Sequence, residues 1–188
     1  MTRPAAPLIL AAILSLAFSL SPARAFQSRD HLTPQEVDLV KEAQILDKRI
    51  DVFVKAAERR LLALNGVDAT SAKQLKKDSE RWGELPTGTR AELLGDIAKI
   101  LDEAITNIDD VSSRDERNPL IPKALRRLAT EATRIEDQLK PLQAQAKGEA
   151  EVASLEQLLE NAQSIVAAAN KLPPPAEKPA GKKEKGKG

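Results

Sequence analysis

The sequence predicts an all-α protein: a mostly antiparallel bundle of four long helices and one short helix, followed by a disordered C-terminal tail. Two observations support this prediction. Apolar residues recur at steps of three and four along every periodic segment, as they do on the buried face of an amphipathic helix. No segment shows the strict alternation of apolar and polar residues that indicates a strand. Short connections between the segments favour antiparallel neighbours.

Residues 1–25 are predicted to be a cleaved signal peptide. Arg3 precedes an apolar run over residues 8–20, and residues 23–25 fit the small-x-small pattern of a cleavage site. The run is about 13 residues long, against the roughly 20 that a membrane-spanning helix needs, and an uncleaved anchor is the alternative. The chain has no cysteine, which excludes disulfides and a lipidated cysteine. We therefore expect an exported protein, periplasmic or secreted, whose first mature residue is Phe26.

Residues 26–172 are long enough for one domain with its own core, the predicted α-helical bundle domain. Its longest helix is expected over residues 34–64. Thr33 is the predicted N-cap, Glu36 completes a capping box, and Gly66 follows the C-terminal end. One face of this helix carries an apolar stripe that comprises Leu39, Ala43, Leu46, Ile50, Phe53, Ala57 and Leu64.

A short helix is expected next, over residues 72–85, with Ser71 at its N-cap. The following helix begins after Thr89, which heads a second capping box. We expect it to extend toward Arg117, because the two aspartates at 109–110 are unfavourable at a helix C-terminus. Its apolar stripe comprises Leu94, Ile97, Leu101, Ala104, Ile108 and Val111.

The last two helices are expected over residues 121–146 and 152–169. Their apolar registers differ in phase across Gly148, which favours a turn there. Pro141 lies within the first register, and we expect it to kink the helix rather than to end it. Residues 173–188 contain no apolar residue beyond alanine and are rich in proline, lysine and glycine, which is typical of a disordered basic tail.

Charge and composition argue against nucleic-acid binding. Residues 1–25 hold two of the 29 basic residues and none of the 28 acidic ones, so the rest of the chain is close to neutral. After position 25 the aromatic residues are Phe26, Phe53 and Trp82. Binders of nucleic acid need a basic surface, and those of single strands also stack bases on aromatic side chains.

The candidate for chemistry is His31, the only histidine in the chain. General acid–base, nucleophilic and zinc sites are built mainly from histidine, cysteine and paired carboxylates. This chain offers one histidine, no cysteine, and helix stripes without aspartate or glutamate, and His31 lies near the mature N-terminus, where we expect mobility. The acidic residues at 102–103 and 109–110 are interpreted as a solvated face. We therefore expect no enzymatic activity, no metal and no cofactor.

Two basic clusters, within residues 55–60 and 123–127, are interpreted as solubilising. Phosphate or anionic lipid would be the alternative ligand, but acidic neighbours supply helix-surface ion pairs. Arg60 stands out because it occupies a position of the apolar stripe. Its long side chain is expected to reach solvent from there.

Residues 31–37, His-Leu-Thr-Pro-Gln-Glu-Val, resemble the Leu-Thr-x-x-Gln motif of the periplasmic helical stress proteins and metal-stress sensors. Here Gln35 comes one residue early, which moves it about 100° around a helix, and the sequence has no second copy of the motif. The resemblance covers this short segment alone. It implies a periplasmic chaperone or sensor, and no site residue is carried over from it.

The function we expect is non-enzymatic binding, as an envelope scaffold, adaptor or chaperone-like module with an envelope protein as partner. The alternative is a small-ligand carrier that holds a lipid or cofactor in an apolar cavity between helices. The tail adds a candidate contact with an anionic membrane surface, and a purely solubilising tail is the other interpretation. The lysines of this contact are Lys178, Lys182, Lys183, Lys185 and Lys187. The sequence leaves the oligomeric state open.

Overall fold

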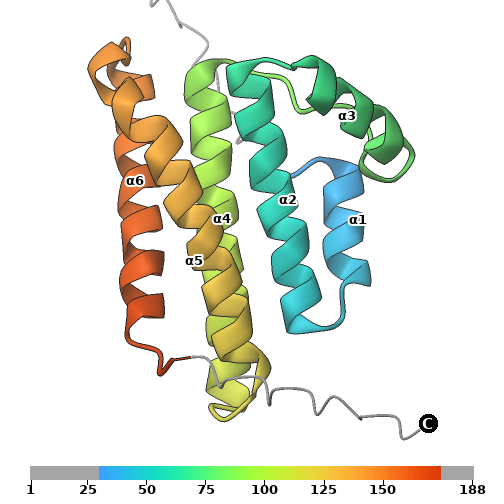
Figure 1. The fold of residues 1–188 in the computed structure, drawn as a ribbon, viewed down its shortest axis with the longest axis vertical. Helices are drawn as coiled ribbons and strands as arrows, with labels where there is room; N and C mark the ends of the chain where they lie inside the picture. Colours follow the sequence, from blue (N-terminus) through green and yellow to red (C-terminus); the bar gives the residue numbers. More distant parts are fainter. Residues whose placement is uncertain (1–29, 175–188) are drawn as a thin grey trace, which may run out of the picture.

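The structure, a computed structural model, describes residues 30–174, and this part of the chain is all-α without a strand (Figure 1). The predicted fold class, an all-α helical bundle, is confirmed. The predicted signal peptide and nearly all of the predicted tail lie outside the described residues. The elements are α1 (Pro34–Glu42), α2 (Leu46–Asn65), α3 (Ala69–Trp82), α4 (Arg90–Arg114), α5 (Leu120–Leu139), a 3₁₀ helix η1 (Lys140–Gln145) and α6 (Glu149–Asn170).

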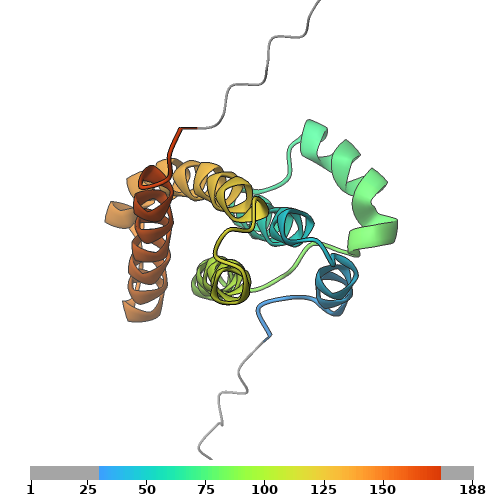
Figure 2. The same ribbon diagram turned by 90° about the horizontal axis from the view of Figure 1, so that it is seen from below.

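Four helices, α2, α4, α5 and α6, enclose the core. Successive members of this set run in opposite directions, and each packs against at least two of the others (Figures 1 and 2). The core is aliphatic apart from Phe53, and none of the helices in residues 30–174 is long and apolar enough to cross a membrane. The largest fully buried apolar side chains are Ile50, Phe53, Leu94, Ile97, Ile100, Leu101, Leu128, Ile135, Leu139 and Leu158.

The prediction of one long helix over residues 34–64 is wrong, because the chain turns back between α1 and α2. Ile45 in the connection is 56% exposed, and α1 lies beside α2 in the opposite direction (Figure 1). Side chains replace the helical hydrogen bonds at the break: Arg49 donates to the carbonyl oxygen of Ala43, and Gln44 to that of Lys41. The periodicity of the sequence does not indicate this turn, since the apolar stripe continues through residues 43–46 without a change of phase.

α3 lies outside the four-helix core, on the side of α1 and α2 (Figure 2). It begins and ends three residues earlier than expected, because Asp68 rather than Ser71 is its N-cap and accepts a hydrogen bond from the Ser71 N–H at 2.7 Å. None of its side chains is buried. Glycines with positive φ flank it, Gly66 at 86° and Gly83 at 66°.

The capping boxes predicted at Thr33 and Thr89 are both present. α4 ends at Arg114, which is three residues short of the expected end, and Arg114 lies 3.7 Å from the carboxylate of Asp110.

The predicted kink at Pro141 is wrong in detail. α5 ends at Leu139, and the chain continues as the 3₁₀ helix η1 with the proline in its first turn. Proline has no N–H for an α-helical bond and restricts the residue before it, so the α-helix stops there. The predicted break at Gly148 is present, with φ 79° just before α6.

Candidate binding cleft

Glu36 and Arg60 form a buried ion pair between α1 and α2. Oε1 of Glu36 lies 2.6 Å from Nη1 of Arg60, and the two residues are 0% and 1% exposed. Arg60 also donates to the carbonyl oxygens of Ala56 and His31, at 3.0 and 2.6 Å. Oε2 of Glu36 accepts a hydrogen bond from the backbone N–H of Thr33 at 2.9 Å. One carboxylate therefore completes the cap of α1 and also joins α1 to α2.

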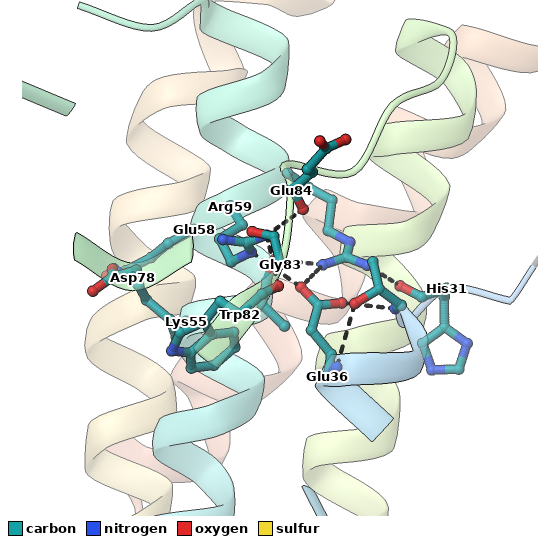
Figure 3. Close-up of polar contacts among 12 residues, drawn as sticks. His31, Glu36, Lys55, Glu58, Arg59, Asp78, Trp82, Gly83 and Glu84 are labelled. Carbon is teal, nitrogen blue, oxygen red and sulfur yellow. Dashed lines mark hydrogen bonds and ion pairs between the residues drawn. The ribbon is translucent and has the colours of Figure 1, made fainter. Parts of the chain in front are cut away.

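Arg59 fastens the C-terminal end of α3 to α2 (Figure 3). Its Nη2 donates to the carbonyl oxygens of Trp82, Gly83 and Glu84, at 3.1, 3.2 and 2.5 Å. Its guanidinium carbon lies 5.8 Å from the centroid of the Trp82 ring. A cation at the last carbonyl groups of a helix is favourable, because these groups carry partial negative charge and lack helical partners.

The two arginines share the single carboxylate of Glu36. Nε of Arg59 is 3.3 Å from Oε1 of Glu36, but it is not aligned for a hydrogen bond. Nε and Nη1 of Arg59 and Nε of Arg60 have no hydrogen-bond partner among the described residues. Burial lowers the pKa of Arg59, and the negative charge of Glu36 opposes this effect. The cluster thus buries more positive than negative charge, which makes the remaining contacts of each arginine important for stability.

A cleft of about 510 Å³ lies beside this cluster, between α2, α3 and α5. Its volume is within the range of pockets that bind small molecules or the side chains of a partner. Leucine side chains from α2 and α3 form the apolar part of the lining, and charged and amide side chains surround them. The lining includes Leu61, Leu62, Leu75, Lys55, Glu58, Gln74, Asp78, Arg134 and Gln138.

Lys55 on α2 forms the ion pair that holds the middle of α3. Its Nζ lies 3.2 Å from Oδ2 of Asp78, and Gln74 donates a hydrogen bond to the same carboxylate at 2.9 Å. Burial acts in the opposite direction, yet the hydrogen bonds from Gln74 and Lys55 lower the pKa of Asp78 below its usual value. Asp78 is therefore ionised at neutral pH and attracts α3 to α2.

The α5 side of the cleft is formed by Arg134 and Gln138. Arg134 donates to Glu131 at 2.5 Å and lies 3.6 Å from the carboxylate of Glu58 on α2. The hydrogen bond to Glu131 raises the pKa of Arg134. The cleft therefore presents fixed charges of both signs around a leucine floor, an arrangement suited to recognition by hydrogen bonds and ion pairs.

His31, which the sequence places in a segment expected to be mobile, contacts both α2 and α4 in the structure. Its Nε2 is 2.6 Å from Oε2 of Glu103 on α4, and its carbonyl oxygen accepts the hydrogen bond from Arg60. The imidazole ring points away from the arginine cluster (Figure 3). Within residues 30–174 no three His, Cys, Asp or Glu side chains are placed to hold a metal ion.

The two basic clusters singled out in the sequence are largely engaged in the fold. Arg59 and Arg60 are buried, so the expectation that Arg60 reaches solvent is wrong: it meets Glu36 instead. In the second cluster Lys123 pairs with Asp47, Arg127 with Asp51, and Arg126 donates to the carbonyl oxygen of Pro173.

Carboxylates also enter the interior, although the apolar stripes read from the sequence contain neither aspartate nor glutamate. Glu36, Asp96 and Glu131 are each less than 5% exposed. Glu36 pairs with Arg60 and Glu131 pairs with Arg134, which offsets the cost of removing them from water. The sequence contains one indication of a buried carboxylate, which is Arg60, a cation at a position of the apolar stripe. Its partner, Glu36, could not be identified from the sequence, because the two residues meet only when the chain turns back between α1 and α2.

The five tail lysines assigned to anionic-surface contact, residues 178, 182, 183, 185 and 187, lie outside the described residues. Comparison with protein-family models, with curated proteins and with solved structures gives no match for this chain. The cleft and the arginine cluster must therefore be interpreted from their own geometry.

Proposed function

We propose that the protein is an exported, non-enzymatic binding protein, which acts as a scaffold, adaptor or chaperone-like module for another protein of the cell envelope. The observation that carries the proposal is the position of α3. It stands outside the core with no buried residue and leaves the cleft of about 510 Å³ against α2 and α5. A domain that needed α3 only for stability would bury its apolar face.

The cleft is proposed as the place where the partner binds. Its leucines supply apolar area, and Lys55, Asp78 and Arg134 supply charges whose present partners a segment with complementary charges could replace. Exchange of one ion pair for another preserves electrostatic balance while the apolar contact contributes affinity. We propose that no chemical step is involved, since His31, the side chain best suited to proton transfer, is not among the residues that line the cleft.

Site-specific photo-crosslinking in intact cells tests this proposal. A photoreactive residue at Gln74, which lines the cleft, should yield an adduct with a discrete protein. The same residue at Gln143, exposed in η1 and away from the lining, is the matched control. Equal adducts from both positions, or none from Gln74, would rule out the cleft as the binding place.

Export is part of the proposal and has its own test. Cleavage of residues 1–25 predicts that the protein recovered from the envelope fraction begins at Phe26. N-terminal analysis of the purified protein measures this directly. An intact N-terminus on protein recovered from the membrane fraction would instead indicate the uncleaved anchor.

A carrier of a small apolar ligand is the second candidate, favoured by a groove of about 270 Å³ between α4, α5 and α6. Apolar side chains from the three helices dominate its lining, and its volume suits one acyl chain segment better than a whole lipid. The main apolar contributors are Leu101, Ile105, Ile108, Leu125, Ile165 and Ala168. Extraction of purified protein with organic solvent should recover bound lipid if this function holds, and Ile105→Glu should abolish the recovery.

A further inference from the structure

The outer face of α3 carries a row of cations. Lys73, Lys76, Lys77 and Arg81 are all exposed, while Glu80 is the single exposed acid among them. At 100° per residue these positions fall within an arc of about 140°. Ser71, Leu75, Asp78 and Trp82 occupy the opposite face and are partly covered. One side of α3 therefore faces the bundle and carries both apolar and polar residues. The other side faces solvent and is basic.

None of these four cations is within ion-pair distance of a carboxylate in the part of the chain that the structure describes. Several exposed basic residues on other elements do have a carboxylate partner: Lys123 pairs with Asp47, Arg127 with Asp51, and Arg90 with Glu151. On the neighbouring helix α2, Lys55 faces α3 and forms an ion pair with Asp78. Among the described residues, four cations without a carboxylate partner thus lie together on one face of α3, whereas other unpaired lysines, such as Lys99, Lys147 and Lys171, lie apart from one another, in α4, before α6 and after α6.

We infer that the outer face of α3 is an electrostatic contact for an anionic lipid membrane surface. Three of its four cations are lysines, which act as flexible point charges, and such residues are depleted from the cores of protein interfaces. The face has no aromatic or large apolar side chain to serve as an anchor in a protein pocket. A layer of anionic headgroups requires neither feature, because it offers diffuse negative charge in a plane.

The geometry fits a contact along a plane. α3 has 14 residues and spans about 21 Å at 1.5 Å per residue. Its cations recur over two and a half turns on one side, so that all of them reach the same surface together. This contact is separate from the cleft, which opens toward the opposite face of α3.

Vesicle sedimentation tests the inference with the purified chain that begins at Phe26. Vesicles of phosphatidylcholine with 30% phosphatidylglycerol are the probe, at about 0.05 M salt, where surface charges are weakly screened. The triple variant Lys73→Gln, Lys76→Gln, Lys77→Gln should lower the partition coefficient about 100-fold, since each lysine near such a surface contributes roughly fivefold. Neutral phosphatidylcholine vesicles and about 0.5 M salt should each reduce binding of the unsubstituted chain to background.

The matched control removes the same charge elsewhere. Lys99, Lys147 and Lys171 are exposed, and no ion pair engages them among the described residues, so their triple glutamine variant should bind anionic vesicles like the unsubstituted chain. Equal loss in both triple variants would show that only net charge matters and would overturn the inference. No binding of the unsubstituted chain, or equal binding to neutral vesicles, would also overturn it.

A third variant separates α3 from the C-terminal tail. Glutamine at the five tail lysines, 178, 182, 183, 185 and 187, should leave most of the vesicle binding in place. If this variant loses binding while the α3 variant retains it, the tail is the contact and the inference is wrong. Amine acetylation provides an independent measurement: bound vesicles should protect Lys73, Lys76 and Lys77 and leave Lys99 reactive.

Discussion

At the scale of single residues, Glu36 and Arg60 are the side chains on which the N-terminal part of the fold most depends. Removal of one partner leaves the other as an uncompensated buried charge, which typically costs about 3–5 kcal/mol. Arg60→Met should therefore lower the free energy of unfolding by this amount in urea denaturation. Glu36→Gln should have a similar effect, because it leaves two arginines without a carboxylate.

The double variant Glu36→Gln, Arg60→Met is the control for this prediction. It should be less destabilised than the sum of the single variants, because each substitution removes the charge that the other leaves unpaired. Strict additivity of the two losses would mean that the pair does not interact in the way that the 2.6 Å contact implies.

Loss of the N-cap of α1 should change the free energy of unfolding by less than loss of the Glu36–Arg60 pair. Thr33 accepts a hydrogen bond from the backbone N–H of Glu36, so Thr33→Ala should lower the free energy of unfolding by about 1 kcal/mol. Thr87→Ala, in the exposed stretch before α4, serves as the control and should change it by less than about 0.5 kcal/mol. Equal losses at the two positions would contradict a specific role of the cap. This device was fully predictable from residues 33–36, because capping is a local interaction.

At the scale of elements, Gly83 determines how the chain leaves α3. With φ at 66° and ψ at −164°, it has a backbone conformation that is strained for any residue with a Cβ, and an added Cβ would lie 3.2 Å from the Gln35 side chain. Gly83→Ala should therefore reduce the free energy of unfolding by about 2 kcal/mol or more.

Gly66 is a matched comparison at the other end of α3. Its φ is also positive, at 86°, but an added Cβ would meet no atom within 4 Å. Gly66→Ala should therefore lose less stability than Gly83→Ala, as measured by thermal or urea unfolding. A loss at Gly66 equal to that at Gly83 would show that the backbone conformation alone, and not the contact with α1, determines the result.

The ion pair between Lys55 and Asp78 makes the attachment of α3 dependent on pH. The pKa of Asp78 is lowered in the folded protein, so its contribution is present above the pKa of the unfolded state and is lost as the pH falls through the folded-state pKa. Stability should therefore decline below about pH 4. Asp78→Asn should reduce this decline and cost about 1 kcal/mol or less at pH 7.

Asp137→Asn is the control for the pH dependence. Asp137 is exposed on α5, and the structure describes no hydrogen bond or ion pair for its side chain. The variant should keep the same loss of stability between pH 5 and 3 as the unsubstituted chain. If both variants change the slope equally, the pH dependence reflects total charge rather than the attachment of α3.

In the molecule as a whole, local patterns predicted the all-α bundle and most helix boundaries to within a few residues, but not the chain reversal after α1 or the position of α3 outside the core. The stripe of α4 is buried at Leu94, Ile97, Leu101 and Ile108, as expected, and the phase change at Gly148 marks a real boundary. The turn after α1 escaped prediction because a stripe continues through it, and only tertiary contacts such as that of Glu36 with Arg60 make the reversal favourable.

The candidate cleft was also beyond prediction from the sequence. It depends on two non-local facts: that α3 lies outside the core, and that Arg134 of α5 approaches Glu58 of α2. Sequence periodicity reports which face of a helix is apolar, not how far that helix stands from its neighbours. The basic residues of α3 follow helical spacing in the sequence, but the absence, among the described residues, of carboxylates within ion-pair distance of them depends on the fold.

α3 lies outside the core beside the candidate cleft, and amide hydrogen exchange of the free protein measures how firmly this helix is attached. Residues of α3 have no buried side chain and few packed neighbours, so they should open with a much smaller free energy than α2 or α4 and exchange far faster. The expected result is fast exchange across Ala69–Trp82, while the central residues of α2 and α4 exchange only by global unfolding. Exchange of α3 as slow as that of the four core helices would show that α3 is as firmly packed as the core.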